Sequence, residues 1–200
     1  MVIRDPLARR PASPSLASTA SVTHHKGCNS ATCCSPAKIW RTLQTLIKED
    51  DPGALIKHFE QADEQRLQHI VRVALTARLS NDASLYPPSQ QHKLVRLTSR
   101  EAMLCFGKSF RDLNSLQLAL LASSEATVLA LFTQLKSYAE SLGEAEKWSS
   151  FINHIWGQGN TTLHLAAHLQ RREVIKQLLE LECCKIHVRN ARNRYPEDCC

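Results

Sequence analysis

The amino-acid sequence predicts an all-α protein, and three observations support that class. From Ile39 onward, apolar residues recur at the spacing of helical turns. No segment of the sequence alternates apolar and polar residues over a length that would predict a sheet. The stretch Thr161–Glu182 has the pattern of a complete helix–turn–helix unit, in which a polar Thr pair precedes two apolar stripes. Helices alone are therefore expected to bury the apolar residues of this chain.

Residues 1–36 are predicted to form a disordered tail. They are rich in Ser, Ala, Pro and Thr, and Pro6, Pro11, Pro14 and Pro36 interrupt any long helix. A segment of this composition buries too little apolar surface to offset the entropy that it would lose on ordering. We expect folded structure to begin after this tail.

Residues 37–110 are predicted to form a helical extension. Asp51-Pro52-Gly53 interrupts the apolar pattern, and Pro52 suits the first turn of a new helix. The resulting apolar stripes are Ile39, Leu43, Leu46 and Ile47, then Leu55, Ile56 and Phe59, then Leu67, Ile70, Val71, Ala74 and Leu75. A loop is expected over Asn81–Gln91. Whether the extension holds one or more degenerate repeats stays open, because its spacing fits the later helix–turn–helix unit poorly.

The unit Thr161–Glu182 carries the most specific signal in the chain. Its first helix has a small-residue face and its second a branched one, which suits two helices that pack closely and stack on neighbours. The two stripes are Leu163, Leu165, Ala166 and Ala167, and Val174, Ile175, Leu178 and Leu179. The opening hexapeptide, Thr161-Thr162-Leu163-His164-Leu165-Ala166, resembles the ankyrin-repeat signature T-P-L-H-x-A. This resemblance implies an ankyrin-like helical solenoid.

The resemblance extends over residues 111–200, which we divide into ankyrin-like units. These are a degenerate unit with an insertion at 112–156, a clear unit at 157–189 and a partial unit at 190–200. Asn114 in the degenerate unit precedes Thr161 by 47 residues, about 14 more than the family period near 33. Gln117 there replaces the motif histidine. The surplus, Ser137–Trp156, is expected to extend one helix and to add another that ends at the tryptophan.

Two turn positions support this repeat register. Gly159 precedes the Thr pair, and Asn193 holds the corresponding place before Tyr195-Pro196-Glu197-Asp198, which resembles the opening of the partial unit. Gly and Asn both tolerate the left-handed conformation that such turns need. Gln170 and Glu182 stand where the family usually has Gly at helix ends, so these two turns are expected to be less favourable.

Composition and charge argue against several classes of partner. Apolar residues make up 43% of the 200 residues, but no apolar run approaches the ~20 residues of a transmembrane helix. The net charge of +6 is not gathered into a dense basic run, which argues against nucleic acid. No secretory signal precedes the eight cysteines, so we expect reduced thiols and an intracellular location, cytoplasmic or nuclear.

No catalytic, metal or cofactor site is predicted, so we do not expect an enzyme. The resemblance implies that His164 is structural, with its ring hydrogen-bonded to backbone of the neighbouring hairpin. Cys105, on an apolar helix face, suits a small core residue better than a nucleophile. The histidines and cysteines of the tail lack the paired spacing of a zinc site. These residues are His24, His25, Cys28, Cys33 and Cys34.

The expected function is protein–protein binding by a scaffold or adaptor. The resemblance implies a contact surface on the hairpin tips and on the concave face of the first helices. The tip positions are Gly157, Gln158 and Asn160, followed by Ala191, Arg192 and Arg194. The concave positions are His168 and Leu169, with Leu121 and Ala122 one unit earlier. Because Arg192 and Arg194, with Arg189 nearby, make one edge basic, we predict a protein partner with an acidic segment.

Two alternative functions stay open. One is a regulatory subunit that docks an enzyme such as a phosphatase, because Lys93-x-Val95-x-Leu97 differs by one residue from a phosphatase-docking motif. The other is a truncated fragment of a longer ankyrin protein, because the pattern stops at Cys200 within a unit. Two repeats bury too little core alone, so the extension must cap them, or the protein must dimerise or bind its partner. The run from residue 154 to residue 167 is similar to fungal ankyrin proteins of unassigned function.

Overall fold

The computed structural model describes residues 35–81, 84, 87–89, 97, 99–107 and 111–200. Within these ranges the regular elements are helices, and a single isolated β-bridge joins Leu79 to Leu113. The predicted all-α class is therefore confirmed for the described residues. All of these elements belong to one compact unit, Thr32–Cys200.

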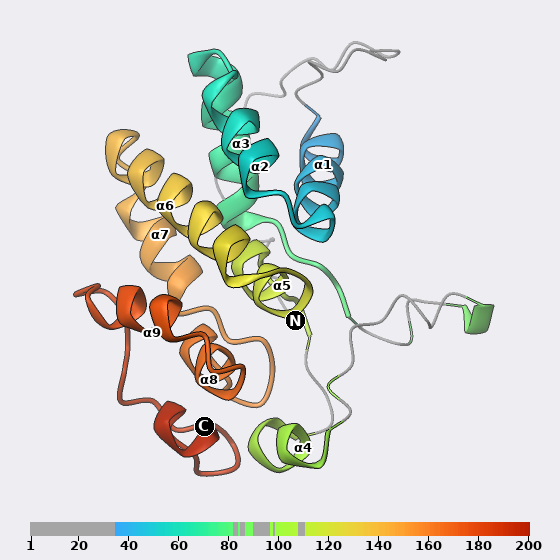
Figure 1. Ribbon diagram of the computed structural model, residues 1–200, viewed down its shortest axis with the longest axis vertical. Helices are drawn as coiled ribbons and strands as arrows, with labels where there is room; N and C mark the ends of the chain where they lie inside the picture. The colour runs from blue at the N-terminus through green and yellow to red at the C-terminus, as the bar shows by residue number, and fades with distance from the viewer. Residues whose placement is uncertain (1–34, 82–83, 85–86, 90–96, 98, 108–110) are drawn as a thin grey trace, which may run out of the picture. The chain divides into compact units, whose positions relative to one another are not determined.

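Short helices account for most of the described chain (Figure 1). In chain order they are α1 (Pro36–Glu49), α2 (Pro52–Glu60), α3 (Glu64–Thr76), α4 (Arg100–Phe106), α5 (Ser115–Ala122), α6 (Glu125–Ser141), α7 (Ala145–Ile152), α8 (Thr162–His168), α9 (Arg172–Leu179) and the 3-10 helix η3 (Pro196–Cys199). Among the described residues, no helix combines the length and the apolarity needed to cross a bilayer.

The first helix begins at the boundary where the predicted tail should end. α1 starts at Pro36 itself, because proline is compatible with the first turn of a helix. Pro36 was predicted to be the last residue of the tail, but it is helical, so that boundary is corrected by one residue. The remainder of the predicted tail, residues 1–34, lies outside the described residues. α2 begins at Pro52 as expected, where the Asp51 carboxylate accepts the Ala54 N–H at 2.9 Å.

The helices form two rows of inner and outer partners (Figure 1). α1, α5, α8 and η3 contact one another in that order, and α2, α6 and α9 form the second row. Each of the three inner α-helices also contacts the outer helix that follows it. Three helix pairs, α1–α2, α5–α6 and α8–α9, therefore share one buried core, which includes Ile39 in the first pair and Leu178 in the last.

Acidic side chains connect the second and third outer helices, α6 and α9, to the helix pair before each of them. The Asp50 carboxylate accepts the N–H and the hydroxyl of Ser124 at 2.8 Å each and the hydroxyl of Thr127 at 2.7 Å. These bonds, that from Thr127 above all, hold the pKa of Asp50 below its ordinary value. One unit later, Glu125 accepts the Glu173 N–H at 3.0 Å at the start of α9. N–H groups without a partner in their own helix are thereby satisfied, and the stacking register is fixed.

Two further helices, α3 and α7, follow the outer helices of the first two pairs and pack against each other. α7 also lies along α6, where the rings of Phe132 and Trp148 meet edge-on with centroids 5.4 Å apart. The predicted insertion therefore forms a longer α6 and a separate α7. The expectation that the added helix runs to Trp156 is wrong, because α7 ends at Ile152 and the tryptophan lies in the turn that follows.

The apolar stripe predicted for the last outer helix, α9, is only partly buried. Val174 and Leu178 are buried, but Leu179 is 52% exposed. Its counterpart one unit earlier, Phe132, is buried because α7 covers it. α9 packs against α6 and α8 through its other face, which leaves Leu179 on the solvent side.

Backbone hydrogen bonds connect the turns between helix pairs. They run from Leu79 N–H to the Leu113 carbonyl, from Arg111 N–H to the Trp156 carbonyl and from Ala191 N–H to the Gln158 carbonyl, each at 2.7 Å. Gly159 and Asn193 have φ angles of +74° and +59°. The expectation that both tolerate a left-handed turn conformation is therefore confirmed.

Gln170 adopts the left-handed conformation between α8 and α9, with φ of +53°. Its side chain is exposed, and Gly adopts this conformation without the steric cost of a Cβ. We expect Gln170→Gly to raise the free energy of unfolding by about 0.5–1 kcal/mol, measured by urea denaturation. Gln170→Ala is the matched control, because it keeps the Cβ. A Gly variant no more stable than the Ala variant would contradict the backbone explanation.

Candidate protein-binding surface

The motif histidine is buried between the start of α8 and the next turn. Nδ1 of His164 accepts the Thr161 N–H at 3.2 Å, which assigns the proton to Nε2. Nε2 then donates to the Arg194 carbonyl at 3.1 Å. His164 has no exposed surface. It therefore makes the backbone contact expected of a structural histidine at this position.

Gln117 makes the same connection one unit earlier. Its Oε1 accepts the Asn114 N–H at 3.1 Å, and its Nε2 donates to the His154 carbonyl at 2.9 Å. Oδ1 of Asn114 accepts the Gln117 N–H at 2.8 Å in return, which completes a capping box. An amide offers the same acceptor and donor as a neutral imidazole, so the replacement preserves the link between helix and turn.

This equivalence predicts how His164 tolerates substitution. We expect His164→Gln to keep the fold close to wild-type stability, because Gln117 shows that an amide serves this position. His164→Ala removes the buried hydrogen bonds of the ring to Thr161 and Arg194 and leaves the buried Thr161 N–H without its acceptor, which should lower the free energy of unfolding by about 2–3 kcal/mol. Urea denaturation of both variants measures the difference. Equal losses of unfolding free energy in the two variants would contradict the hydrogen-bonding role. They would indicate that packing of the imidazole ring determines the contribution of His164 to stability.

The same residue contributes a pH dependence of stability. Burial lowers the pKa of His164 below its ordinary value of 6.5, although the bond to Arg194 opposes this shift. Because the unfolded chain binds the proton more readily, the contribution is fully present above pH 6.5 and is lost as the pH falls towards the folded-state pKa. His164→Gln should therefore reduce the slope of stability between pH 6 and pH 5, by up to about 1.4 kcal/mol per pH unit. An unchanged slope would contradict this assignment.

A pair of buried amides holds α4 against the turns that were predicted as contact tips. Nδ2 of Asn160 donates to the Phe106 carbonyl at 3.1 Å, and Nδ2 of Asn190 donates to the Cys105 carbonyl at 2.6 Å. Asn190 also donates to Oδ1 of Asn160 at 2.8 Å. The last carbonyls of α4, which have no partner within the helix, are satisfied in this way.

Aromatic contacts complete the docking of α4. The Phe106 ring lies edge-on to Trp156, with centroids 5.1 Å apart, and to His168, with centroids 4.9 Å apart. Gly107 then turns the chain with φ of +81°, and a Cβ there would lie 1.9 Å from Oε1 of Gln158. The end of α4 and the two turns consequently form one buried cluster.

The first predicted tip is therefore only partly available to a partner. Asn160 is completely buried and holds α4, so its expected role as a contact residue is corrected. Gly157 and Gln158 are half-buried in the turn. We predicted an open surface for all three residues because nothing in the sequence indicates that α4 covers them.

The predicted concave residues are divided between buried and open positions. His168 is half-buried against the Phe106 ring. Leu169 and Leu121 pack partly against the core, whereas Ala122 is exposed. These four residues do not form one open patch, because α4 covers part of the inner row.

The second predicted tip is open. Its three predicted contact residues, Ala191, Arg192 and Arg194, are all exposed. Oδ1 of Asn190 accepts the backbone N–H groups of Arg192 and Arg194 at 2.9 and 3.0 Å, which fixes the turn. Neither guanidinium forms an ion pair with any residue that the structure describes. The turn thus presents two unpaired positive charges on a rigid backbone.

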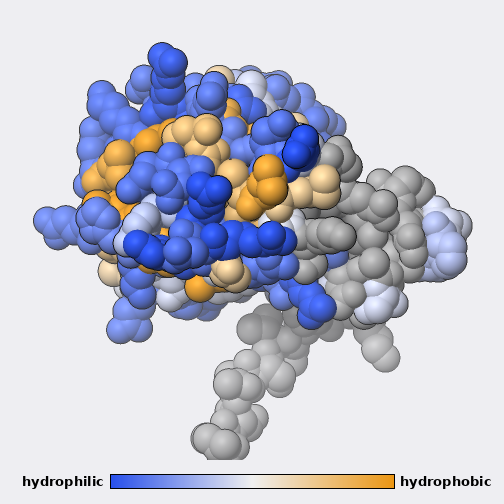
Figure 2. Space-filling view, turned by 90° about the horizontal axis from the view of Figure 1, so that it is seen from below, coloured by the Kyte–Doolittle hydropathy of each residue, from blue (hydrophilic) through white to orange (hydrophobic). Residues whose placement is uncertain are grey.

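Arg189 extends this basic edge. Its guanidinium lies 4.4 Å from the centroid of the Tyr195 ring, and its Nη1 donates to Oδ1 of Asn193 at 2.7 Å. Of the two acids that follow this turn, Asp198 accepts the Tyr195 N–H at 2.8 Å and Glu197 is exposed. Figure 2 shows one face of the molecule, where hydrophilic residues surround smaller hydrophobic patches. We call Arg189, Arg192 and Arg194 the basic edge.

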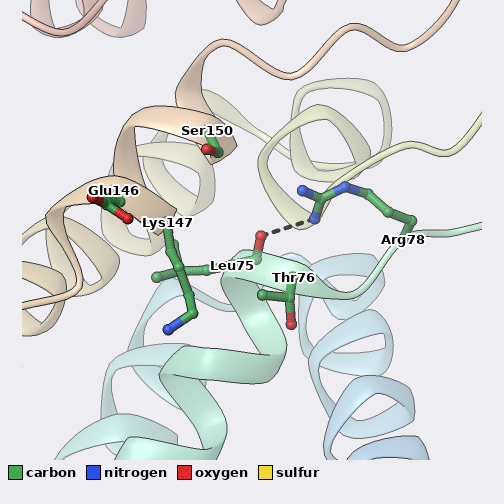
Figure 3. Close-up of a pocket in the computed structure, with 6 residues that line it drawn as sticks. All are labelled: Leu75, Thr76, Arg78, Glu146, Lys147 and Ser150. Carbon is green, nitrogen blue, oxygen red and sulfur yellow. Dashed lines mark hydrogen bonds between the residues drawn. The ribbon is translucent and has the colours of Figure 1, made fainter. Parts of the chain in front are cut away.

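A surface cavity of about 380 Å³ lies between α3 and α7 (Figure 3). It is lined by Leu75, Thr76, Arg78, Glu146, Lys147 and Ser150. Arg78 Nη1 donates to the carbonyls of Leu75 at 2.9 Å and Ala77 at 2.8 Å, which closes the end of α3. Lys147 pairs with Glu144. Both cations of the cavity therefore serve contacts within the fold, and no group of His, Cys, Asp or Glu in the described ranges is arranged to hold a metal.

Sequence reasoning missed the role of Asn190 and the docking of α4. Asn190 contacts residues 30 and 85 positions away in the chain, whereas periodicity reports only local spacing. A buried Asn and an ordinary turn Asn look alike in sequence.

Lys93 and Val95 of the candidate docking motif lie outside the described residues. Comparison with known proteins gives no match to a family model, a curated protein or a solved structure.

Proposed function

We propose that this protein is a non-catalytic scaffold or adaptor that binds an acidic segment of a protein partner through its basic edge. We further propose that the frame behind this edge is an ankyrin-like solenoid. The observation that carries the proposal is the exposure of Arg192 and Arg194 on a turn that the buried Asn190 holds in place. Two exposed cations on a backbone turn held by hydrogen bonds are suited to a carboxylate-rich ligand.

The equivalent bonds of His164 and Gln117 support the ankyrin-like frame. Each side chain accepts an N–H at the start of its own inner helix and donates to a carbonyl in the following turn. Two units with different side chains thus keep the same pattern of contacts. Such a shared pattern is expected of a repeat whose sequence has diverged while its geometry is kept.

Contacts at the ends of the inner helices extend the frame to the first pair. The Ser123 hydroxyl donates to the Ile47 carbonyl at 2.6 Å, and Arg171 donates to the Ser123 carbonyl at 2.9 Å. Asp50 and Gln170, which follow the inner helices of the first and last pairs, both have positive φ angles, of 55° and 53°. These similarities support the interpretation that α1 and α2 are a degenerate repeat that caps the stack.

Selection of peptides from a random display library on the immobilised full chain tests the proposed ligand class. We expect the enriched peptides to be rich in Asp and Glu, and their binding to weaken with salt, because exposed charges are screened. Arg192→Glu/Arg194→Glu should abolish the enrichment. Lys57→Glu/Arg172→Glu is the matched control, because it reverses two exposed charges on the outer helices. Enriched peptides without acidic residues, or enrichment that survives the reversal at the basic edge, would contradict the proposal.

A further inference from the structure

The surface beneath α4 contacts the end of that helix through backbone groups. Two buried amides, Nδ2 of Asn160 and Nδ2 of Asn190, donate to the carbonyls of Phe106 and Cys105 at 3.1 and 2.6 Å. These two carbonyls are consecutive in the chain. Because carbonyls at the end of a helix lack a partner within it, the amides recognise a helix end rather than a particular polar side chain.

The apolar contact to this surface is made by the aromatic side chain at the end of α4. Phe106 is 1% exposed, and its ring packs edge-on against the rings of Trp156 and His168. The next residue, Gly107, has φ of +81°, and a Cβ there would lie 1.9 Å from Oε1 of Gln158. The surface therefore accepts a helix that ends in an aromatic residue followed by glycine.

The rest of α4 contributes little to its own docking. Among the residues that precede Phe106, Ala102 is buried and Cys105 is half-buried. The large apolar side chains of Met103 and Leu104 are 39% and 58% exposed. With 7 residues, α4 is much shorter than the ~12–15 residues at which an isolated helix becomes marginally stable in water. Because it is held mainly at one end, α4 should open locally at low cost in free energy.

We propose that the surface beneath α4 is a binding site for a helix of a partner protein, and that α4 occupies this site as a built-in competitor. The partner helix ends in an aromatic residue followed by glycine, and it presents its last carbonyls to Asn160 and Asn190. When α4 leaves, both buried amides lose an acceptor, which favours refilling of the site by such a helix end. The inference does not depend on the charges of the basic edge, so either proposal can fail alone.

Competition by α4 lowers the apparent affinity of the site for a partner. A segment tethered to its own site acts at an effective concentration on the order of millimolar. A ligand that needs the open state binds with an apparent Kd equal to its intrinsic Kd divided by the fraction of open molecules. A substitution that weakens the docking of α4 should therefore strengthen the binding of a competing helix end.

A synthetic peptide with the sequence of residues 99–107, amidated and labelled with a fluorescent dye, tests this proposal. Fluorescence anisotropy under reducing conditions measures its binding to the full chain as wild type, as Phe106→Ala and as the control Phe132→Ala. Phe132 is also 1% exposed, but it lies in α6 against Trp148. Its truncation therefore loosens the core without vacating the site. A second peptide, with alanine in place of the phenylalanine, controls for specificity.

We expect Phe106→Ala to bind the first peptide at least about tenfold more tightly than the wild type, because the truncated α4 competes less. Phe132→Ala should bind it like the wild type, and the alanine peptide should bind none of the three proteins. When the wild type is saturated with peptide, its own residues 100–107 should exchange hydrogen at least about tenfold faster, because α4 is displaced. The dye separates the peptide from the protein's own fragment by mass.

Four results would overturn the proposal. They are the absence of saturable binding to the wild type or to Phe106→Ala, an equal gain in affinity by Phe132→Ala, binding of the alanine peptide as tight as that of the first, and binding to the wild type without faster exchange of residues 100–107. Circular dichroism shows whether each variant keeps its helices. If Phe106→Ala unfolds, the exchange measurement on the wild type decides the question alone.

Discussion

Trp156→Ala is expected to lower the free energy of unfolding by about 3–5 kcal/mol, the largest loss from any single truncation considered for this chain. Trp156 has no exposed surface, its ring packs edge-on against Phe106, and its indole N–H donates to the Thr161 carbonyl at 2.9 Å. Its removal leaves a cavity at the junction of α4 and two turns and takes away the hydrogen bond from the indole to Thr161. Thermal and urea unfolding of the full chain measure the loss.

Trp40 provides the matched control for that substitution. It is only partly buried against the core in α1, so Trp40→Ala should cost less than about half as much, in proportion to the apolar area that it buries. Trp156→Phe should recover most of the loss, because a ring again fills the site. Equal losses from Trp156→Ala and Trp40→Ala would contradict the view that α4 and the turns form one packed cluster.

Asn190→Asp is expected to lower the free energy of unfolding by about 2–4 kcal/mol, although the two side chains have nearly the same shape. Nδ2 of Asn190 donates to the Cys105 carbonyl and to Oδ1 of Asn160. A carboxylate cannot donate, so the variant places an oxygen and a charge against two acceptors in a buried position. α4 should detach first, which hydrogen exchange at residues 100–107 would detect as faster exchange.

Asn193→Asp is the control, because it adds the same charge to the same turn at an exposed position. Aspartate tolerates the left-handed conformation and still accepts the bond from Arg189 that Oδ1 of Asn193 now receives. Its effect should stay within about 0.5 kcal/mol. If Asn190→Asp is equally mild, the amide pair does not hold α4, and the docking geometry is wrong.

Sequence alone predicted the helical class, the helix–turn–helix of Thr161–Glu182 and several turn residues. These features are local, because a Thr pair, an apolar stripe or a turn Asn reveals itself within a few residues. Leu118 and Leu165, matched across units by spacing alone, are both buried, with 1% and 0% of their surface exposed. Gln117, matched to His164 by the same gapless register, makes the equivalent hydrogen bonds.

The sequence did not predict which surface remains open. Asn160 and Arg192 both lie on turns and were assigned the same role, yet one is buried and the other exposed. The difference arises from α4, whose docking depends on contacts between residues far apart in the chain. Leu179 was misassigned for a related reason, because burial of an outer-helix position depends on whether another helix covers it. Periodicity predicts an apolar face but not its neighbour.

The most direct test of the proposed function compares the proteins that copurify with three forms of the full chain in cells of its source. The forms are the wild type, Arg192→Glu/Arg194→Glu and the control Lys57→Glu/Arg172→Glu. We predict at least one protein with an acidic segment that the wild type and the control retain, and that the reversed basic edge depletes about tenfold or more, a loss of about 1.4 kcal/mol in binding. Retention of the same proteins by all three forms would contradict binding through Arg192 and Arg194.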